Sequence, residues 1–263
     1  MSLSNLLREF GKSKLNTLTK YPSILTLHEI GKKNRLTDKL TTSLVGKNLY
    51  ATEKIDGTSI RLLYYKGERI VGTRENLFTF EQSDFINIPK EFFSMINYVK
   101  PFYEKAKWNI RYDTDKLIVL YGELYGSAIG SNAKNYGTDK IGFRLFDVVV
   151  YEDLSILNRP LEDISRWREK VTDNGIIYGQ NFLTRDEMIS QFKEFEFAPT
   201  VDFDLGDMSH ETILRNLKKY IPTTNVALSE SALKRPEGLI LRSEDRSAIV
   251  KVRYEDYERT LRQ

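Results

Sequence analysis

The residues best suited to chemistry form the run Glu53-Lys54-Ile55-Asp56-Gly57-Thr58-Ser59. Lys54 ends a segment with strand character and precedes an Asp-Gly turn, which would place its amine at the edge of a sheet. A lysine is a nucleophile only when deprotonated, so its ordinary pKa of about 10.4 must be lowered by nearby cations or by desolvation. Other positive side chains are therefore expected near Lys54.

The four residues from Lys54 to Gly57 also have a simpler interpretation. An Asp-Gly turn is typical of a β-hairpin, and the lysine before it would then face solvent. On this short pattern alone, the hairpin is the favoured interpretation. Residues elsewhere in the chain must decide between the two.

Composition excludes several kinds of site. The 263 residues include no cysteine and only two histidines, so disulfides, cysteine zinc sites and thiol nucleophiles are excluded, and a histidine metal cluster is not expected. Any metal should be a hard cation held by oxygen, Mg²⁺ or Mn²⁺. The sequence also lacks the glycine-rich phosphate-binding loops of dinucleotide-binding and P-loop proteins.

Charge is unevenly distributed although the net charge is only +3. Residues 1 to 40 hold eight Lys/Arg and three Asp/Glu, whereas residues 185 to 211 hold two and eight. A basic segment suits a polyanion, but a solvated face is the commoner explanation. No apolar run approaches the roughly 18 residues of a membrane span, so a cytoplasmic, intracellular protein without a membrane partner is expected.

Five motifs downstream of Lys54-Ile55-Asp56-Gly57 favour a reactive lysine over a simple hairpin. They follow in the order Gly72-Thr73-Arg74, Tyr121-Gly122-Glu123-Leu124-Tyr125-Gly126, Phe146-Asp147-Val148-Val149, Pro236-Glu237-Gly238-Leu239-Ile240 and Val250-Lys251-Val252-Arg253. This order resembles the covalent nucleotidyltransferases, which include ATP-dependent ligases and mRNA capping enzymes. Upstream, Lys20-Tyr21-Pro22-Ser23-Ile24 followed by His28 looks like the opening of the RNA ligase 2-like branch. The resemblance spans residues 20 to 253.

The resemblance implies an ATP-dependent RNA ligase with Lys54 as the nucleophile to which AMP is attached. Lys251 and Arg253 lie two apart on an expected strand and share a face, where two cations could hold the α-phosphate and lower a lysine pKa. An exposed strand face is an equally good interpretation of that pair alone. The family usually has lysine at both positions, and Arg253 keeps the charge without being an equivalent group.

Further nucleotide-binding roles follow from the same resemblance. Its counterparts suggest that Glu123 bonds the ribose hydroxyls, that Phe146 stacks on adenine and that Arg74 engages the nucleotide and the 5′-phosphate strand. Glu237 resembles the acid that positions a divalent metal, while Glu53 and Ile55 would border the adenine edge. Without the motif, an aromatic residue such as Phe146 would more often belong to the core, and a lone Glu-Gly to a turn.

Two residues that support the lysine motif depart from the branch. RNA ligase 2 enzymes typically have His and Asn where this chain has Asp56 and Ser59, whereas DNA ligases usually have Asp and Arg. Ser59 cannot make the full set of hydrogen bonds of either residue. The mixed pattern leaves the strand substrate open between RNA, DNA and mixed nicks.

The expected reaction has three steps: AMP moves from ATP to Lys54, then to a nucleic-acid 5′-phosphate, and a 3′-hydroxyl finally displaces it. RNA repair in the cytoplasm, in a phage or a cell, by a monomer is the expected setting, and a protein partner that supplies end recognition stays open. The alternatives are a minimal DNA ligase, a capping guanylyltransferase, or an inactive module that binds nucleotide or nucleic acid. DNA ligases and capping enzymes normally carry an OB domain after the last motif, and only ten residues follow Arg253.

Strands and helices must position these residues. Strands are predicted over Leu49–Lys54, Thr58–Tyr65, Glu68–Arg74, Leu117–Tyr125, Phe143–Tyr151, Gly238–Ser243 and Ala248–Arg253. Helices are predicted around residues 3–10 and 92–103, from Leu161 after Asn158 and Pro160, after Thr184 with Glu187 as a capping box, and after Ser209. Residues 11 to 46 look polar and irregular.

Strands in blocks at both ends, with helices between them, predict an α+β fold built on an antiparallel sheet. No repeat or linker marks a boundary within the chain. A single adenylyltransferase domain over residues 1–263 is therefore expected, with 1–45 as a basic segment packed on it and no C-terminal OB domain.

Overall fold

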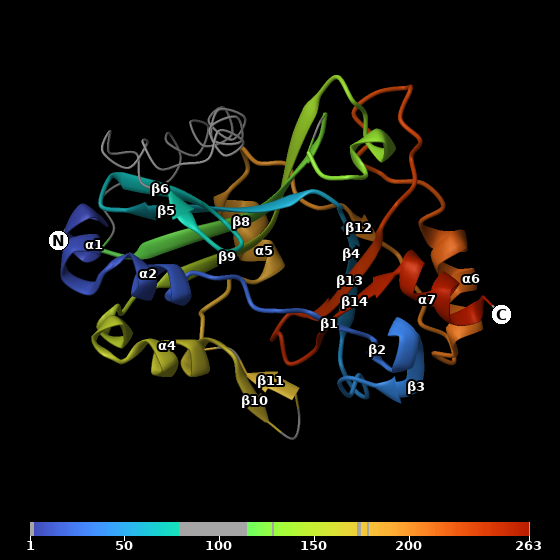
Figure 1. Ribbon diagram of the computed structural model, residues 1–263, viewed down its shortest axis with the longest axis horizontal. Coiled ribbons are helices and arrows are strands. Elements are labelled where there is room, and N and C mark those ends of the chain that lie inside the picture. The colour runs from blue at the N-terminus through green and yellow to red at the C-terminus, as the bar shows by residue number, and fades with distance from the viewer. Residues whose placement is uncertain (1–2, 79–114, 128, 173–174, 178, 263) are drawn as a thin grey trace.

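The computed structural model describes residues 3–78, 115–127, 129–172, 175–177 and 179–262, and its main feature is a pair of five-stranded sheets (Figure 1). The first sheet has the order β1 (Leu25–Thr26), β14 (Ile249–Arg253), β13 (Gly238–Ser243), β4 (Leu49–Lys54) and β12 (Thr200–Val201). The second has the order β7 (Leu77–Phe78), β6 (Glu68–Thr73), β5 (Thr58–Tyr65), β8 (Leu117–Gly126) and β9 (Ile141–Tyr151). Neighbouring strands are antiparallel except β1, which joins β14 in parallel.

Helices cover these sheets, and two small hairpins extend from them (Figure 1). The helices are α1 (Leu3–Phe10), α2 (Lys12–Leu18), α4 (Leu161–Arg168), α5 (Arg185–Gln191), α6 (His210–Tyr220) and α7 (Tyr254–Leu261). The hairpins pair β2 (His28–Ile30) with β3 (Leu36–Leu40), and β10 (Lys170–Thr172) with β11 (Gly175–Ile177). The 3₁₀ turns are η1 (Lys32–Asn34), η3 (Ala133–Asn135) and η4 (Ser155–Asn158). The α+β class predicted from the sequence is confirmed.

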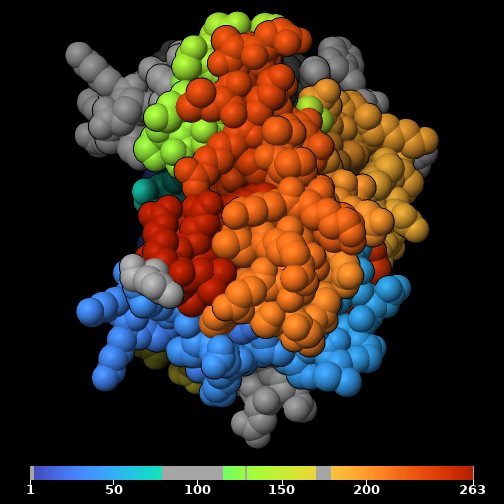
Figure 2. Space-filling view, turned by 90° about the vertical axis from the view of Figure 1, so that its right-hand side faces the viewer, coloured from blue at the N-terminus to red at the C-terminus, as the bar shows by residue number. Residues whose placement is uncertain are grey.

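The first sheet is apolar on one face and polar on the other, because side chains alternate along each strand. The apolar face packs on α6 and α7 through a buried cluster: Ala51, Leu239, Leu241, Val250, Val252, Ile213, Leu217 and Tyr257. Figure 2 shows the two helices side by side at the surface, α6 in orange and α7 in red. The other face carries Thr52, Lys54, Ile240 and Lys251. Strand pairing places Ile240 between Thr52 on one side and Lys251 on the other. The alternation therefore separates core residues from residues able to do chemistry.

The second sheet is buried on both faces. One face packs against α5 and the segment after it, through residues such as Met188 and Phe192. The other packs against α1, α2 and α4, through Leu6, Leu15 and Ile164. Burial on both faces explains why β8 and β9 read as continuous apolar runs.

The Asp56-Gly57 turn joins the two sheets, so the hairpin interpretation is wrong. β4 pairs with β13 and β12, whereas β5 pairs with β6 and β8. A Cβ at Gly57 would lie 2.2 Å from the carbonyl oxygen of Leu124, so only glycine allows this close crossing. Lys54 therefore ends one sheet where the next begins.

Some expectations need correction. Residues 11 to 46 are not irregular, because they contain α2, β1, β2 and β3. The ten residues after Arg253 contain the helix α7. Asn158 does not begin the helix at Leu161, because it ends η4, and Pro160 precedes α4 without a side-chain cap. The capping box at Thr184 and the Ser209 cap are confirmed. The helix expected over 92–103 lies outside the described residues, and no described helix is long and apolar enough to cross a membrane.

Candidate active site

A pocket of about 380 Å³ lies between the two sheets, within the size range of ligand sites. The first sheet and its extension contribute Thr52, Glu53, Lys54, Ile55, Ile240, Arg242 and Lys251. The second sheet and its flank contribute Ser59, Arg74, Glu123 and Phe146. The remaining lining residues are Ala198 and the segment Tyr21-Pro22-Ser23-Ile24-Leu25. Eight of the eleven predicted site residues therefore line one pocket, although they are far apart in sequence, and the other three, Asp56, Glu237 and Arg253, are described below.

Lys54 makes an ion pair with Glu237 inside this site. Its Nζ lies 2.6 Å from Oε2 of Glu237, and both side chains are mostly buried, 27% and 19% exposed. The strand pairing explains the contact. Gly238 lies opposite both Lys54 and Arg253, so Glu237, the residue before it, is brought next to Lys54. A Cβ at Gly238, whose φ is +154°, would lie 2.0 Å from the carbonyl oxygen of Val252. Glycine therefore lets the strands approach at the point where Glu237 meets Lys54.

Lys251 supplies a second cation to the pocket. It lies on the Lys54 face of the sheet, where both Lys251 and Thr52 pair with Ile240. Burial lowers its pKa, and the nearby charges of Arg253 and Lys54 lower it further. No acidic side chain in the described residues forms an ion pair with Lys251, so its charge is available to an anion in the pocket.

Arg253 has a different environment from Lys251. Its guanidinium binds both carboxylate oxygens of Asp256 at 2.8 Å, through Nε and Nη2. Asp256 is only 1% exposed and also accepts a bond from Arg259 at 2.6 Å. Arg253 is not among the residues that line the pocket, and it reaches the site through its charge near Glu237 and Lys251.

Phe146 lies at a β-bulge. The register between β8 and β9 shifts at Tyr121/Gly122, so Phe146 has no partner while Asp147 lies opposite Tyr121. A bulge turns two consecutive side chains to one face. Phe146 therefore lines the pocket beside Tyr21, with ring centroids 5.1 Å apart at 83°.

Asp147 organises the end of the pocket farthest from Lys54 along the strand β13. Its Oδ2 accepts hydrogen bonds from Tyr21 at 2.7 Å, from Arg242 at 2.8 Å and from Arg246 at 2.6 Å. Asp147 and Arg242 are both buried. The shared carboxylate ties the N-terminal segment, β9 and β13 together around the Phe146 ring.

Comparison with known proteins places this geometry in a family. The RNA ligase family model matches residues 47–253. The chain belongs to the RNA ligase family. No curated protein matches it.

Solved RNA ligases have the same fold at low identity. A point mutant of the Naegleria gruberi RNA ligase with ATP and Mn aligns with TM-score 0.54 and 16% identity over 92% of this chain and 58% of that one. A second point mutant of that ligase, in the apo form, aligns with TM-score 0.53 and 17% identity, over 92% of this chain and 57% of that one. This chain thus spans less than two thirds of either one.

Glu123 of this RNA ligase family member is the acid with the largest pKa change among the site residues. Burial raises its pKa to about 8, Lys54 opposes this shift, and Glu237 and Asp56 reinforce it. Burial also raises the pKa of Glu237, again opposed by Lys54. Glu123 lies opposite Ser59 in the β5–β8 register, so both face the pocket from the second sheet.

Asp56, one of the two residues expected to support the lysine motif, is held by a loop between β8 and β9. The Asp56 carboxylate accepts a hydrogen bond from the Asn132 amide, and the Asp56 backbone N–H donates to the Tyr136 hydroxyl at 2.7 Å. Tyr136 packs in a small core with Ile55. Asp56 thus fixes this loop next to the end of β4, and it does not line the pocket.

Glu53 borders the pocket through its backbone, because its side chain points to the opposite face of the sheet from Lys54. There it is 2% exposed, and its carboxylate accepts hydrogen bonds from the Thr224 hydroxyl and from the Asn225 N–H, the latter at 2.9 Å. Arg74 is at the rim, 61% exposed, and donates to Ser23 at 3.3 Å. Its exposure suits contact with a ligand larger than the pocket.

Several lining residues were not predicted as site residues. Ile240 faces Phe146 from the other sheet, and Arg242 and Thr52 lie on the same strand face as Lys54. Alternation back from Lys54 could have found Thr52, since every second residue of a strand shares a face. Ile240 and Arg242 follow only from the pairing of Gly238 with Lys54, which no local pattern indicates. The contact between Tyr21 and Asp147 is long-range, and no local pattern indicates it.

Proposed function

We propose that the protein is an ATP-dependent RNA ligase that joins a 3′-hydroxyl to a 5′-phosphate through AMP linked to Lys54. The observation that carries the proposal is one pocket lined by an amine, a second cation and an aromatic ring, Lys54, Lys251 and Phe146, with the carboxylate of Glu237 paired to that amine. Such a set suits phosphoryl transfer, which depends on positioning and on stabilising charge. Membership of the RNA ligase family supports RNA as the strand.

In the first step, the Lys54 amine would form a bond to the α-phosphorus of ATP, and the bond to the β-phosphate oxygen would break to release pyrophosphate. Lys251 would stabilise the negative charge that develops on the α-phosphate. Phe146 and Ile240 line opposite sides of the pocket and suit the two faces of adenine. AMP would then pass to a 5′-phosphate, and a 3′-hydroxyl would displace it.

A divalent cation, Mg²⁺ or Mn²⁺, fits the donors present. Glu237 offers a carboxylate beside the Lys54 amine, and hard cations prefer oxygen donors with phosphates and waters completing the shell. No group of three or more His, Asp or Glu that could hold a metal alone occurs in the described part of the chain. Glu237 with the ATP phosphates would therefore hold the ion, which neutralises phosphate charge. The solved Naegleria gruberi ligase contains ATP and Mn, which supports this assignment.

Covalent labelling tests the first step. Incubation with Mg²⁺ and labelled ATP should add AMP to the wild-type chain, and intact mass spectrometry with peptide mapping should locate it on Lys54. Lys54→Ala should take up none, whereas Lys39→Ala, at an exposed lysine paired with Glu29, should label like wild type. No label on wild type, or equal label on Lys54→Ala, would contradict the proposal.

Nicked duplexes test the strand. Four substrates with RNA or DNA on either side of the nick separate the alternatives, because only RNA offers a 2′-hydroxyl. Dependence on a 2′-hydroxyl at the 3′-OH end would support RNA joining. Equal sealing of all-DNA nicks would favour a minimal DNA ligase instead.

A further inference from the structure

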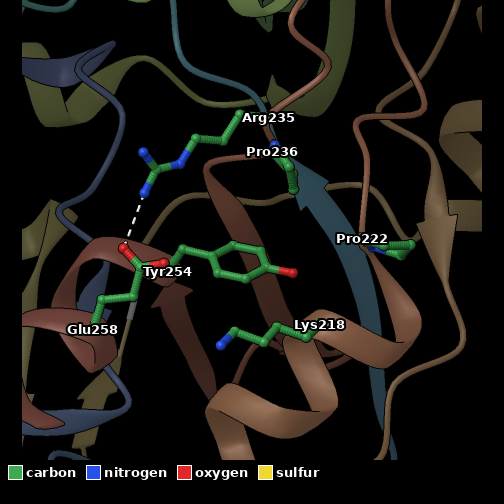
Figure 3. Close-up of a pocket in the computed structure, with 6 residues that line it drawn as sticks. All are labelled: Lys218, Pro222, Arg235, Pro236, Tyr254 and Glu258. Atoms are coloured by element: carbon green, nitrogen blue, oxygen red, sulfur yellow. Dashed lines mark hydrogen bonds and ion pairs between the residues drawn. The ribbon is translucent and has the colours of Figure 1, made fainter.

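A second pocket, of about 280 Å³, lies outside the nucleotide pocket. It is formed by the last turn of α6, the first turns of α7 and the segment that leads into β13. Its lining residues are Lys218, Pro222, Arg235, Pro236, Tyr254 and Glu258 (Figure 3). None of them lines the nucleotide pocket, so the reaction described above leaves this pocket without a role.

Positive charge predominates around this pocket. Arg235 pairs with Glu258 at 2.9 Å, and Arg262 approaches the same carboxylate at 3.6 Å, so one anion is shared by two cations. Lys218 has no ion pair with any described residue. Arg235 is also 60% exposed. Three cations around one carboxylate leave a net positive charge for an anionic ligand.

The pocket also has rigid apolar walls. In Figure 3 the Tyr254 ring lies between Arg235 and Lys218. Its hydroxyl donates to the Ile221 carbonyl at 2.9 Å, which fixes the ring. Pro222 and Pro236 have fixed φ angles, so the walls need little ordering when a ligand binds. Cations beside an aromatic ring and apolar walls suit a nucleotide unit of a single strand.

The backbone connects this pocket to the proposed active site. Pro236 directly precedes Glu237, and Tyr254 directly follows Arg253. The Tyr254 N–H donates to the Glu237 carbonyl at 3.0 Å. An RNA strand whose end lies at Lys54 can therefore continue past the start of β13 and the end of β14 into the second pocket.

We infer that the pocket of Lys218, Arg235 and Tyr254 is a subsite for the RNA strand next to the end being joined. It binds a backbone phosphate through the two cations and a nucleoside against the Tyr254 and proline walls. This subsite rests on the proposed function, because its ligand is the strand that the active site would join.

Charge reversal tests the subsite. In the double variant Lys218→Glu with Arg235→Glu, a fluorescent 5′-phosphorylated single-stranded RNA should bind about 10-fold more weakly at low salt. The slope of log affinity against log KCl should fall by about 0.7, the value for one lost phosphate contact on a single strand. AMP uptake by Lys54 should not change, since neither residue lines the nucleotide pocket.

Two further variants sharpen this test. Glu258→Gln removes the one anion of the pocket and should tighten RNA binding by about 2-fold. Arg159→Glu with Arg166→Glu makes the same charge change near α4, at the opposite end of the molecule (Figure 1), and should weaken binding much less. Unchanged affinity and slope in the Lys218/Arg235 variant, or an equal loss in the α4 variant, would overturn the subsite.

The two proposals fail in different ways. If wild type takes up no AMP but the Lys218/Arg235 variant still loses RNA affinity, the ligase mechanism is wrong and the RNA site remains. If AMP uptake is normal and RNA affinity is unaffected, only the subsite is wrong. Should the double variant unfold, the single changes Lys218→Gln and Arg235→Gln must each give a partial loss, and no loss in either would overturn the subsite.

Discussion

Glu237 is the residue whose contacts bear most directly on the proposed reaction of Lys54. Its carboxylate holds the Lys54 ammonium at 2.6 Å. An ammonium is not a nucleophile, and the same carboxylate is the proposed ligand of a hard cation. Lysine and metal would thus compete for one acid. Metal binding would break the ion pair, and Lys54 would have to give one proton to solvent before its amine attacks.

Glu237→Gln should abolish most of the metal-dependent activity. The amide keeps the size of the side chain but loses its charge, so AMP uptake should fall at least about 10²-fold. The measurement is the initial rate of labelling against MgCl₂ concentration. Glu211→Gln, at an exposed position in α6, serves as the control. An unchanged dependence on MgCl₂ in Glu237→Gln would show that another residue holds the metal.

Glu123 predicts a pH dependence of stability. Its pKa in the folded protein is about 8, above its ordinary value of 4.5, so between these values the folded state binds more protons than the unfolded state. Stability from this group is therefore present at low pH and is lost as pH rises toward about 8, by at most ~1.4 kcal/mol per pH unit. Urea unfolding across this range should show a shallower decline for Glu123→Gln. Parallel pH curves for the two proteins would contradict the assignment.

The bulge in β9 is the element that presents Phe146. Because adenine stacking on an aromatic ring contributes about 1–3 kcal/mol, Phe146→Ala should raise KM for ATP about 10-fold or more. Phe146→Tyr keeps the ring and should retain most of the affinity. A large stability loss in Phe146→Ala with unchanged KM would instead identify Phe146 as a core residue.

Helix α7 is the element that holds Arg253. Asp256→Asn removes a buried charge that binds Arg253 and Arg259, and should lower the free energy of unfolding by about 2–3 kcal/mol. Glu255→Gln changes an exposed acid on the same turn and should cost less than about 0.5 kcal/mol. Chemical denaturation measures both. Equal changes in the free energy of unfolding would mean that the buried contact of Asp256 with Arg253 stabilises the fold no more than an exposed ion pair does.

Long, apolar elements could be predicted from the sequence, whereas short and long-range ones could not. The strands from Leu49 to Tyr65 match the prediction, because their β-branched and aromatic content is a local signal. β1 has two residues, and only its parallel pairing with β14 defines it. The pattern around Asp56 indicated a turn, but which strands pair beside it depends on the distant β13 and β8. The spacing of Tyr254 and Tyr257, with acids in the first turn, could have indicated α7.

The same contrast holds for the site. Family resemblance brought together Lys54, Glu123, Phe146, Glu237 and Lys251, and all five lie in or at the pocket. The resemblance gives Arg253 a role in binding the ATP phosphates. Its bidentate contact with Asp256 follows from their i, i+3 spacing, but the helix α7 that carries Asp256 is not predicted from the sequence. That role for Arg253 remains a prediction.

At the scale of the whole molecule, the pocket draws on both ends of the chain. Tyr21 lies at one wall and Lys251 at another, and β1 pairs directly with β14. Contacts between such distant residues form late and slowly during folding, because a long loop must close first.

The pairing of β1 with β14 has a consequence for synthesis. A ribosome releases β1 long before it has made β14, so the N-terminal segment must wait for nearly the entire chain. A nascent chain that ends before residue 249 would have the second sheet but no partner for Leu25 and Thr26. Nucleotide binding should therefore appear only after β14 has been made, and products truncated before residue 249 should not compete for ATP.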